Sequence, residues 1–186
     1  PGMVMRADVL ANCFNKGIRS HYSKKEELLV IYPSPRGIVW NNIEARKFSK
    51  KYINSNSADQ KDLVFICGRY EGIDERFIEK YVDIEYSIGD YVLTGGEVAT
   101  LAILDSTLRF VDKVLGNSES AEMDSFESGL LDSPKYTRPR EFESQSVPEV
   151  LLSGDHKRIK DFRLTKSIEE TKKYRSDLYE AWRKEI

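Results

Sequence analysis

The pattern of apolar and polar positions predicts short buried strands in the first half of the chain. Residues 28–32 and 63–67 are continuously apolar, and residues 83–89 also have strand character. Continuous apolar runs of this length are typical of strands buried on both faces of a parallel sheet. We expect the first strand to stop at Tyr32, because the following sequence PSPRG breaks regular structure.

Helical periodicity lies between and after these strands. Apolar residues recur at helical spacing in residues 4–14, 41–52 and 73–81, and the strongest helical pattern covers residues 96–115. The apolar face of this last helix is wide enough for two neighbours, so it fits either core packing or a subunit contact. Strands joined by helices in this order predict an α/β fold with a mostly parallel sheet.

The periodicity stops after residue 115. Residues 116–147 are rich in Ser, Glu, Pro and Gly, a composition that predicts an interdomain linker or a lid. A basic helical segment begins near Asp155, and an amphipathic helix covers residues 177–186. We therefore predict three parts: a ligand-binding domain (1–115), a flexible linker (116–147) and a small helical C-terminal domain (148–186).

Composition and charge narrow the class of protein. The chain has 186 residues, 40% hydrophobic and 32% charged, and no apolar run long enough to span a membrane. Residues 1–134 carry 16 Lys and Arg against 21 Asp and Glu (−5), whereas residues 135–186 carry 13 against 10 (+3). We expect an anionic partner to contact the C-terminal third.

The two cysteines, Cys13 and Cys67, are too few for a disulfide framework or a zinc site. A reducing cytoplasm is therefore the expected location. The chain shows no signal peptide.

Two glycine-rich turns follow the second and third strands. Residues 68–72 (GRYEG) and 89–96 (GDYVLTGG) combine glycines, which let backbone approach a ligand closely, with polar and aromatic side chains. Either turn alone is an ordinary connection, but together they predict a ligand site at the carboxyl ends of parallel strands. Neither turn matches G-x-G-x-x-G or the P-loop, so a standard nucleotide fingerprint is absent.

Five stretches in order, PGM, CGRYEGIDER, SIGDYVLTGGE, SPKYTRP and VLLSGDH, resemble the bacterial tRNA (guanine-N1)-methyltransferases of the TrmD family. The resemblance implies a SPOUT fold, with a trefoil knot at the C-terminal edge of the parallel sheet, and a homodimer with a composite active site. It also implies methyl transfer from S-adenosyl-L-methionine to N1 of guanosine 37, which lies 3′ to the tRNA anticodon. Dependence on Mg2+ is implied as well, although no acidic cluster in the sequence specifies a site.

Three loops would form the methyl-donor site in such a protein. The family more often has Leu at the position of Pro33. The residues that correspond to the donor site are Tyr32, Pro33, Ser34, Pro35, Gly68, Tyr70, Glu71, Gly72, Ser87, Ile88, Gly89, Tyr91, Leu93, Gly95, Gly96 and Asp132.

The resemblance also assigns two catalytic residues. Asp124 corresponds to the general base, which removes the proton from guanine N1, and Arg109 stabilises the charge that develops on O6. Without the resemblance, Asp124 is one acid among several in a loop, and Arg109 is a cation favoured at a helix end. Lys157, Arg158 and Lys160 are the expected contacts to tRNA phosphates, or else a solvated helix face.

Two alternatives remain open from the sequence. The first is a tRNA-binding knot protein that has lost catalysis, and the second is another α/β enzyme that binds a small nucleotide. Family members begin with a strand and a helix ahead of the PGM motif, so we expect that this chain is a truncated form.

Overall fold

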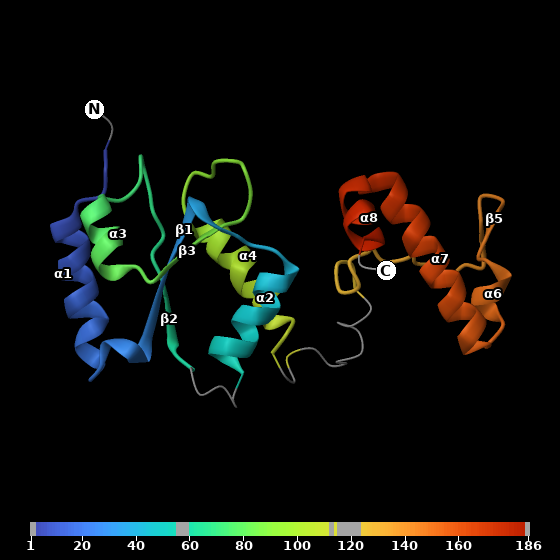
Figure 1. The fold of residues 1–186 in the computed structure, drawn as a ribbon, viewed down its shortest axis with the longest axis horizontal. Helices are drawn as coiled ribbons and strands as arrows, with labels where there is room; N and C mark the ends of the chain where they lie inside the picture. The colour runs from blue at the N-terminus through green and yellow to red at the C-terminus, as the bar shows by residue number, and fades with distance from the viewer. Residues whose placement is uncertain (1–2, 55–59, 112–113, 115–123, 185–186) are drawn as a thin grey trace. The chain divides into compact units, whose positions relative to one another are not determined.

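The computed structural model describes residues 3–54, 60–111, 114 and 124–184. The chain divides into two compact units, Pro1–Gly116 and Asn117–Ile186. The first unit is built of strands and helices, and the second is mainly helical (Figure 1). The functional roles that we assign to residues 1–115, 116–147 and 148–186 stay predictions.

The first unit contains a three-stranded parallel sheet in the order β2-β1-β3. Its strands are β1 (Leu28–Val39), β2 (Asp62–Phe65) and β3 (Ile84–Ser87). Residues 28–31 of β1 pair with β2, and residues 31–33 and 38–39 pair with β3. The predicted α/β fold with a parallel sheet is confirmed.

Helices cover both faces of this sheet. Helices α1 (Ala7–Gly17) and α3 (Glu75–Tyr81) lie on one face, and α2 (Asn42–Phe48) and α4 (Glu97–Leu108) on the other (Figure 1). Successive side chains of a strand point to opposite faces. Alternate residues of β1 therefore enter two separate cores. One contains Phe14, Leu28, Val30, Tyr32 and Phe77, and the other contains Leu29, Ile31, Phe48, Tyr86 and Ile103.

The expected end of the first strand at Tyr32 is wrong, because β1 continues through the PSPRG sequence to Val39. Pro33 and Ile38 both pair with Tyr86, so the residues between them bulge out of the ladder. The register with β2 ends at Ile31. Pro33 and Pro35 thus lie where β1 has a neighbouring strand on one side only. Because no second strand of the described structure pairs there, their missing N–H groups interrupt no hydrogen bonds on that side.

The predicted helices differ from the structure mainly at their ends. Helix α1 begins at Ala7, because Met5 is extended and pairs with Ile73 in a parallel bridge. Helix α4 ends at Leu108, short of the predicted residue 115. Helix α2 is followed by a π-helical turn, Ser49–Ile53, which completes the predicted 41–52 helix. Two short 3-10 turns, Arg19–His21 and Lys25–Glu27, connect α1 to β1.

The second unit contains α6 (Glu149–Leu152), α7 (His156–Tyr174) and α8 (Ser176–Arg183). A hairpin of β4 (Glu141–Phe142) and β5 (Gln145–Ser146) precedes them. The Asp155 carboxylate caps α7 by accepting a hydrogen bond from the Arg158 N–H. Within the described ranges, no helix is both long and apolar enough to cross a membrane.

Part of the predicted linker has defined structure within this second unit. Leu130 is buried, and the Leu131 N–H donates to the Thr171 hydroxyl on α7 over 2.8 Å. The Cβ of an alanine at Gly129 would lie 3.5 Å from the Trp182 ring on α8. Residues 129–131 therefore pack on the C-terminal helices, while the motion of this stretch as a lid stays a prediction.

Candidate functional site

A cleft of about 240 Å³ lies beyond the carboxyl ends of β2 and β3 and beside the bulge in β1. Its walls come from the β1 bulge, from the loop after β2 and from the loop between β3 and α4. This is the edge of a parallel sheet where α/β proteins bind ligands. The two glycine-rich turns thus meet at one cleft.

The structure brings together nearly all of the residues predicted for the donor site. Asp132 is the exception, because it belongs to the second unit, where its carboxylate pairs with Lys135 over 2.5 Å. The ligand of the cleft stays a prediction. The predicted residues that line it are Tyr32, Pro33, Ser34, Pro35, Gly68, Tyr70, Glu71, Gly72, Ser87, Ile88, Gly89, Tyr91, Leu93, Gly95 and Gly96.

Glycine permits two of these loops to touch backbone to backbone. The Gly96 N–H donates to the Gly68 carbonyl over 3.1 Å. A Cβ added at Gly96 would lie 3.0 Å from the Cys67 Cα and 3.2 Å from the Gly68 nitrogen. Both neighbours are backbone atoms that cannot turn aside, so a larger residue would push the two cleft loops apart.

Tyr32 and Ser87 are among the buried hydroxyl-bearing side chains that line the cleft. Tyr32 is 9% exposed, and burial is the main cause that raises the pKa of its phenol. Ser87 is also buried, and its hydroxyl accepts the Gly89 N–H over 3.3 Å. Gly89 has a φ of +145°, so the turn at the end of β3 depends on glycine.

An ion pair crosses the wall between the loop after β2 and the start of α4. The Arg69 guanidinium donates to the Glu97 carboxylate over 2.9 Å. The Glu97 carboxylate accepts a hydrogen bond from the Glu97 backbone amide. This bond and the neighbouring Arg69 hold the pKa of Glu97 below its usual range. The N-terminus of α4 is thus already occupied by a carboxylate of the chain itself.

The predicted glycine-rich turns also bring Arg69, Val92 and Thr94 to the cleft, since these residues stand inside the ranges 68–72 and 89–96. Two further lining residues, Tyr86 and Ala99, were not predicted. Tyr86 and Ala99 carry no such signal, because their place depends on strand register and on the packing of α4.

The two predicted catalytic residues belong to different units. Arg109 follows the last turn of α4 in the first unit and is exposed. Asp124 lies in the second unit, half-buried, and its carbonyl accepts the Glu127 N–H. The structure therefore does not bring them together within one unit.

The predicted tRNA-contacting residues share one setting. Lys157, Arg158 and Lys160 are exposed in the first turns of α7.

No group of three or more His, Cys, Asp or Glu side chains in the described part of the chain could hold a metal ion. The described residues thus provide no basis for placing Mg2+.

Comparisons with known proteins agree with this arrangement. The sequence model of the family described as tRNA (Guanine-1)-methyltransferase TrmD matches residues 1–181. A tRNA (guanine-N(1)-)-methyltransferase of Lachnospira eligens is 48% identical over 181 residues, 97% of this chain and 72% of the relative. A protein of the same name from Geobacter metallireducens is 46% identical over 179 residues, 96% of this chain and 68% of that protein.

A third relative is longer. The tRNA (guanine-N(1)-)-methyltransferase of Chlamydia pneumoniae is 49% identical over 178 residues, which are 96% of this chain and 45% of the relative. The match runs through the cleft loops of the first unit and through the helices of the second. The chain belongs to the tRNA (guanine-1)-methyltransferase TrmD family.

Proposed function

We propose that this protein transfers a methyl group from S-adenosyl-L-methionine to N1 of guanosine 37 in tRNA. The observation that carries the proposal is the convergence of the predicted donor-site residues on one cleft in a chain of the TrmD family. As an enzyme acting on tRNA it would work in the cytoplasm.

The chemistry of the cleft fits a nucleoside bearing a sulfonium better than a phosphorylated nucleotide. Backbone groups and the tyrosines Tyr70 and Tyr91 form much of the wall, and Glu71 adds negative charge beside them. The cation Arg69 is paired with Glu97, which also fills the N-terminus of α4. A phosphate would therefore meet a carboxylate where many nucleotide-binding folds offer free N–H groups.

The bound donor would supply an electrophilic methyl group on its sulfonium. The chain's task is to position the acceptor and to remove the proton from its N1. The Asp124 carboxylate would take that proton as the N1–methyl bond forms and the sulfur–methyl bond breaks. The Arg109 guanidinium would stabilise the negative charge that develops on guanine O6.

We infer that two copies of the chain complete the site. Asp124 and Arg109 belong to different units. The resemblance to the family implies a composite active site, in which Asp124 of one copy would serve the cleft of the other. The exposed apolar side chains of α4, among them Val98 (60% exposed) and Leu101 (65%), offer a surface for such a contact. The trefoil knot of SPOUT proteins would then lie in the first unit of each copy.

The test is methyl incorporation from labelled S-adenosyl-L-methionine into a tRNA with guanosines at positions 36 and 37. Asp124→Asn removes the proposed base, so we expect transfer to fall about 10²- to 10⁴-fold. Arg109→Ala should lower it about 10²- to 10³-fold. Glu127→Gln, the same change in a neighbouring acid, is the matched control and should retain activity.

A wild-type chain that binds tRNA and S-adenosylhomocysteine without transferring methyl groups would contradict the proposal and favour a binding protein. Equal activity in Asp124→Asn and Glu127→Gln would reject the base assignment alone. Label at a position other than N1 of the second guanosine would reject the substrate.

A further inference from the structure

The segment of β1 that reaches the cleft is a bulge with few ladder contacts. We call residues 33–37 the donor loop. Pro33 and Ile38 both pair with Tyr86, so the intervening residues have no ladder partner in β3. Ser34 and Pro35 from this loop line the cleft. The position of these two lining residues must therefore depend on contacts outside the ladder.

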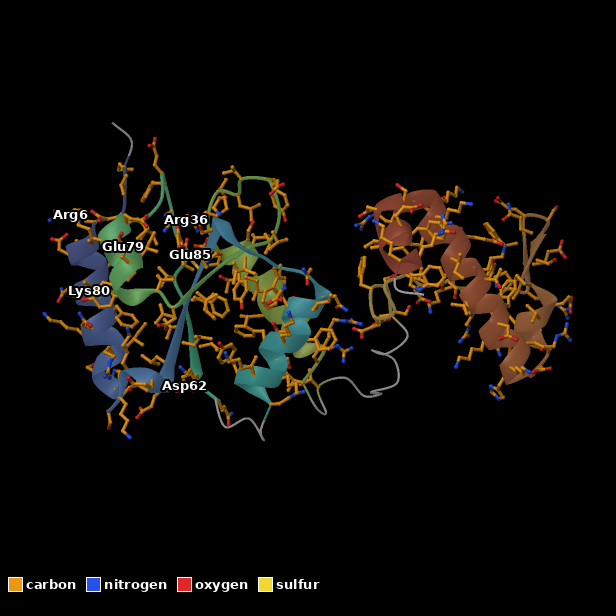
Figure 2. The ribbon with its side chains drawn as sticks, viewed as in Figure 1. Arg6, Arg36, Asp62, Glu79, Lys80 and Glu85 are labelled. Carbon is orange, nitrogen blue, oxygen red and sulfur yellow. The ribbon has the colours of Figure 1, made fainter. Side chains whose placement is uncertain are left out.

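Arg36 makes such contacts from the middle of the donor loop. Its Nε lies 3.1 and 3.0 Å from the two carboxylate oxygens of Glu85 on β3. Its Nη1 and Nη2 lie 3.0 and 2.7 Å from the carboxylate oxygens of Glu75, in the first turn of α3. Figure 2 shows Arg36 and Glu85 close together near the end of β1.

Only an arginine can make this contact in full. The planar guanidinium presents several N–H donors in a fixed fork and can hold two carboxylates at once. A lysine would keep the charge but not the fixed geometry. The side chain of Arg36 thus joins the donor loop to two separate elements of the first unit.

Backbone contacts show how the loop lies on β3. A Cβ added at Gly37 would lie 2.5 Å from the Glu85 carbonyl carbon and the Tyr86 nitrogen. The Arg36 N–H lies 3.3 Å from the hydroxyl of Ser34, which is 7% exposed. Arg36 therefore stands between a residue seated on β3 and a residue that faces the cleft.

The exposure of the ion pairs indicates what they contribute. The side chains of Arg36 and Glu75 are each 53% exposed, and that of Glu85 is 20% exposed. Exposed ion pairs add little to the free energy of unfolding. Two pairs that converge on one loop from different elements instead limit where that loop can lie.

We propose that Arg36 is a positioning residue, which holds the donor loop in its ligand-binding conformation through Glu75 and Glu85. The effect of Arg36 on donor binding rests on the proposed function. Its effect on the conformation of the donor loop does not, so the two effects are measured separately.

The first measurement is hydrogen exchange in the ligand-free chain. Arg36→Ala should speed exchange of the Ile38 amide about tenfold, because the loop then opens locally. Arg76→Ala is the matched control, since Arg76 pairs with Asp74 beside the same helix over 2.7 Å and lies outside the cleft. Equal exchange in the two variants would overturn the inference.

The second measurement is binding of S-adenosylhomocysteine by calorimetry. We expect the Kd to rise about tenfold in Arg36→Ala and about threefold in Arg36→Lys, because the site is no longer preorganised. Glu75→Gln leaves the loop sequence intact and should raise the Kd about threefold. Unchanged Kd values in all three variants would overturn the inference.

Kinetics separates positioning from a general loss of structure. With Arg36→Ala, KM for S-adenosyl-L-methionine should rise about tenfold while kcat at saturating donor stays within about twofold. A fall in kcat with an unchanged KM would contradict the positioning role. If the wild-type chain does not bind S-adenosylhomocysteine, the proposed function fails, and the exchange experiment still decides the role of Arg36.

Discussion

The two units hold their predicted functional residues in opposite ways. In the first unit the cleft lies at the end of strands whose side chains are buried in cores on both faces. In the described part of the second unit the buried residues are Leu130, Ser133 and Thr171, and the predicted tRNA contacts stand on exposed turns of α7. The first unit thus holds the residues of the cleft in fixed positions, whereas the second unit exposes positively charged side chains to solvent.

The difference matches the two proposed ligands. A small donor must be held with its methyl group in line with the acceptor, so the atoms around it must be fixed. A tRNA backbone is long and charged, and exposed cations bind it without a deep pocket. Donor binding should therefore depend on the core of the first unit, and tRNA binding on surface charge in the second.

The strongest test of this comparison removes Phe48, which is 2% exposed and packs against Trp40, Tyr52 and Tyr86. Phe48→Ala should lower the free energy of unfolding of the first unit by about 3–5 kcal/mol, because it leaves a cavity. Urea unfolding can be followed in each unit separately, since the two tryptophans are Trp40 and Trp182.

Trp182→Phe leaves Trp40 as the reporter of the first unit, and Trp40→Phe leaves Trp182 as the reporter of the second. We expect Phe48→Ala to shift the Trp40 transition and to leave the Trp182 transition in place. A common shift of both transitions would show that the units unfold as one.

A smaller effect distinguishes two buried helical threonines, one in each unit. Both hydroxyls donate to a carbonyl four residues earlier over 2.6 Å, Thr107 to Ile103 and Thr171 to Ser167. The Thr171 hydroxyl also accepts the Leu131 N–H. Thr171→Val should therefore cost about 1–3 kcal/mol, because the partly buried Leu131 N–H loses its acceptor.

Thr107→Val removes only the hydrogen bond from the Thr107 hydroxyl to the Ile103 carbonyl. In the described structure no backbone N–H donates to that hydroxyl, so the substitution should cost about 0.5–1.5 kcal/mol. The Trp40 and Trp182 transitions report the two values separately. Equal costs would show that the contact of Leu131 with α7 contributes nothing to the second unit.

A pH dependence follows from Tyr86 in the first unit. Burial, with smaller effects of Glu44 and Tyr52, raises the pKa of Tyr86 to about 12 from an ordinary value of 10.0. The stability linked to this neutral phenol is complete below pH 10 and is lost as the pH rises from 10 towards 12.

Tyr86→Phe should remove this alkaline loss, on the order of 1–2 kcal/mol between pH 10 and 12. Tyr174→Phe is the control in the second unit, since that side chain is 60% exposed. Parallel pH profiles of wild type and Tyr86→Phe, measured by urea unfolding, would contradict the assignment.

The smallest effect concerns the surface charges. Lys160→Gln should weaken tRNA binding about threefold to tenfold and lower the slope of log K against log salt by about one. Binding of S-adenosylhomocysteine should stay unchanged. A change in the affinity for S-adenosylhomocysteine would contradict the assignment of donor binding to the first unit and tRNA binding to the second.

The sequence pattern predicted the strands that are buried on both faces of the sheet. The apolar run from Leu28 gave a central parallel strand, because alternate residues enter different cores. The glycine-rich turns predicted the cleft, because glycine there serves close backbone approach. These features depend on local composition, which a single sequence contains.

The remainder depends on partners far apart in the chain. Proline content argued against a strand beyond Tyr32, yet pairing with β3 on one side allows β1 to continue. The bonds of Arg36 join residues separated by 39 and 49 positions. The docking of Leu131 on Thr171 spans 40 positions. No periodicity reports such contacts.

The bulge in β1 has one more consequence, for how this protein tolerates insertions. In a regular strand, one added residue turns every following side chain to the opposite face. Here both ends of the bulge meet the same residue, Tyr86, so the sheet on either side keeps its alignment whatever the length between them. The donor loop is therefore a point where evolution or an engineer can add residues at the cleft while the two cores keep their sequence.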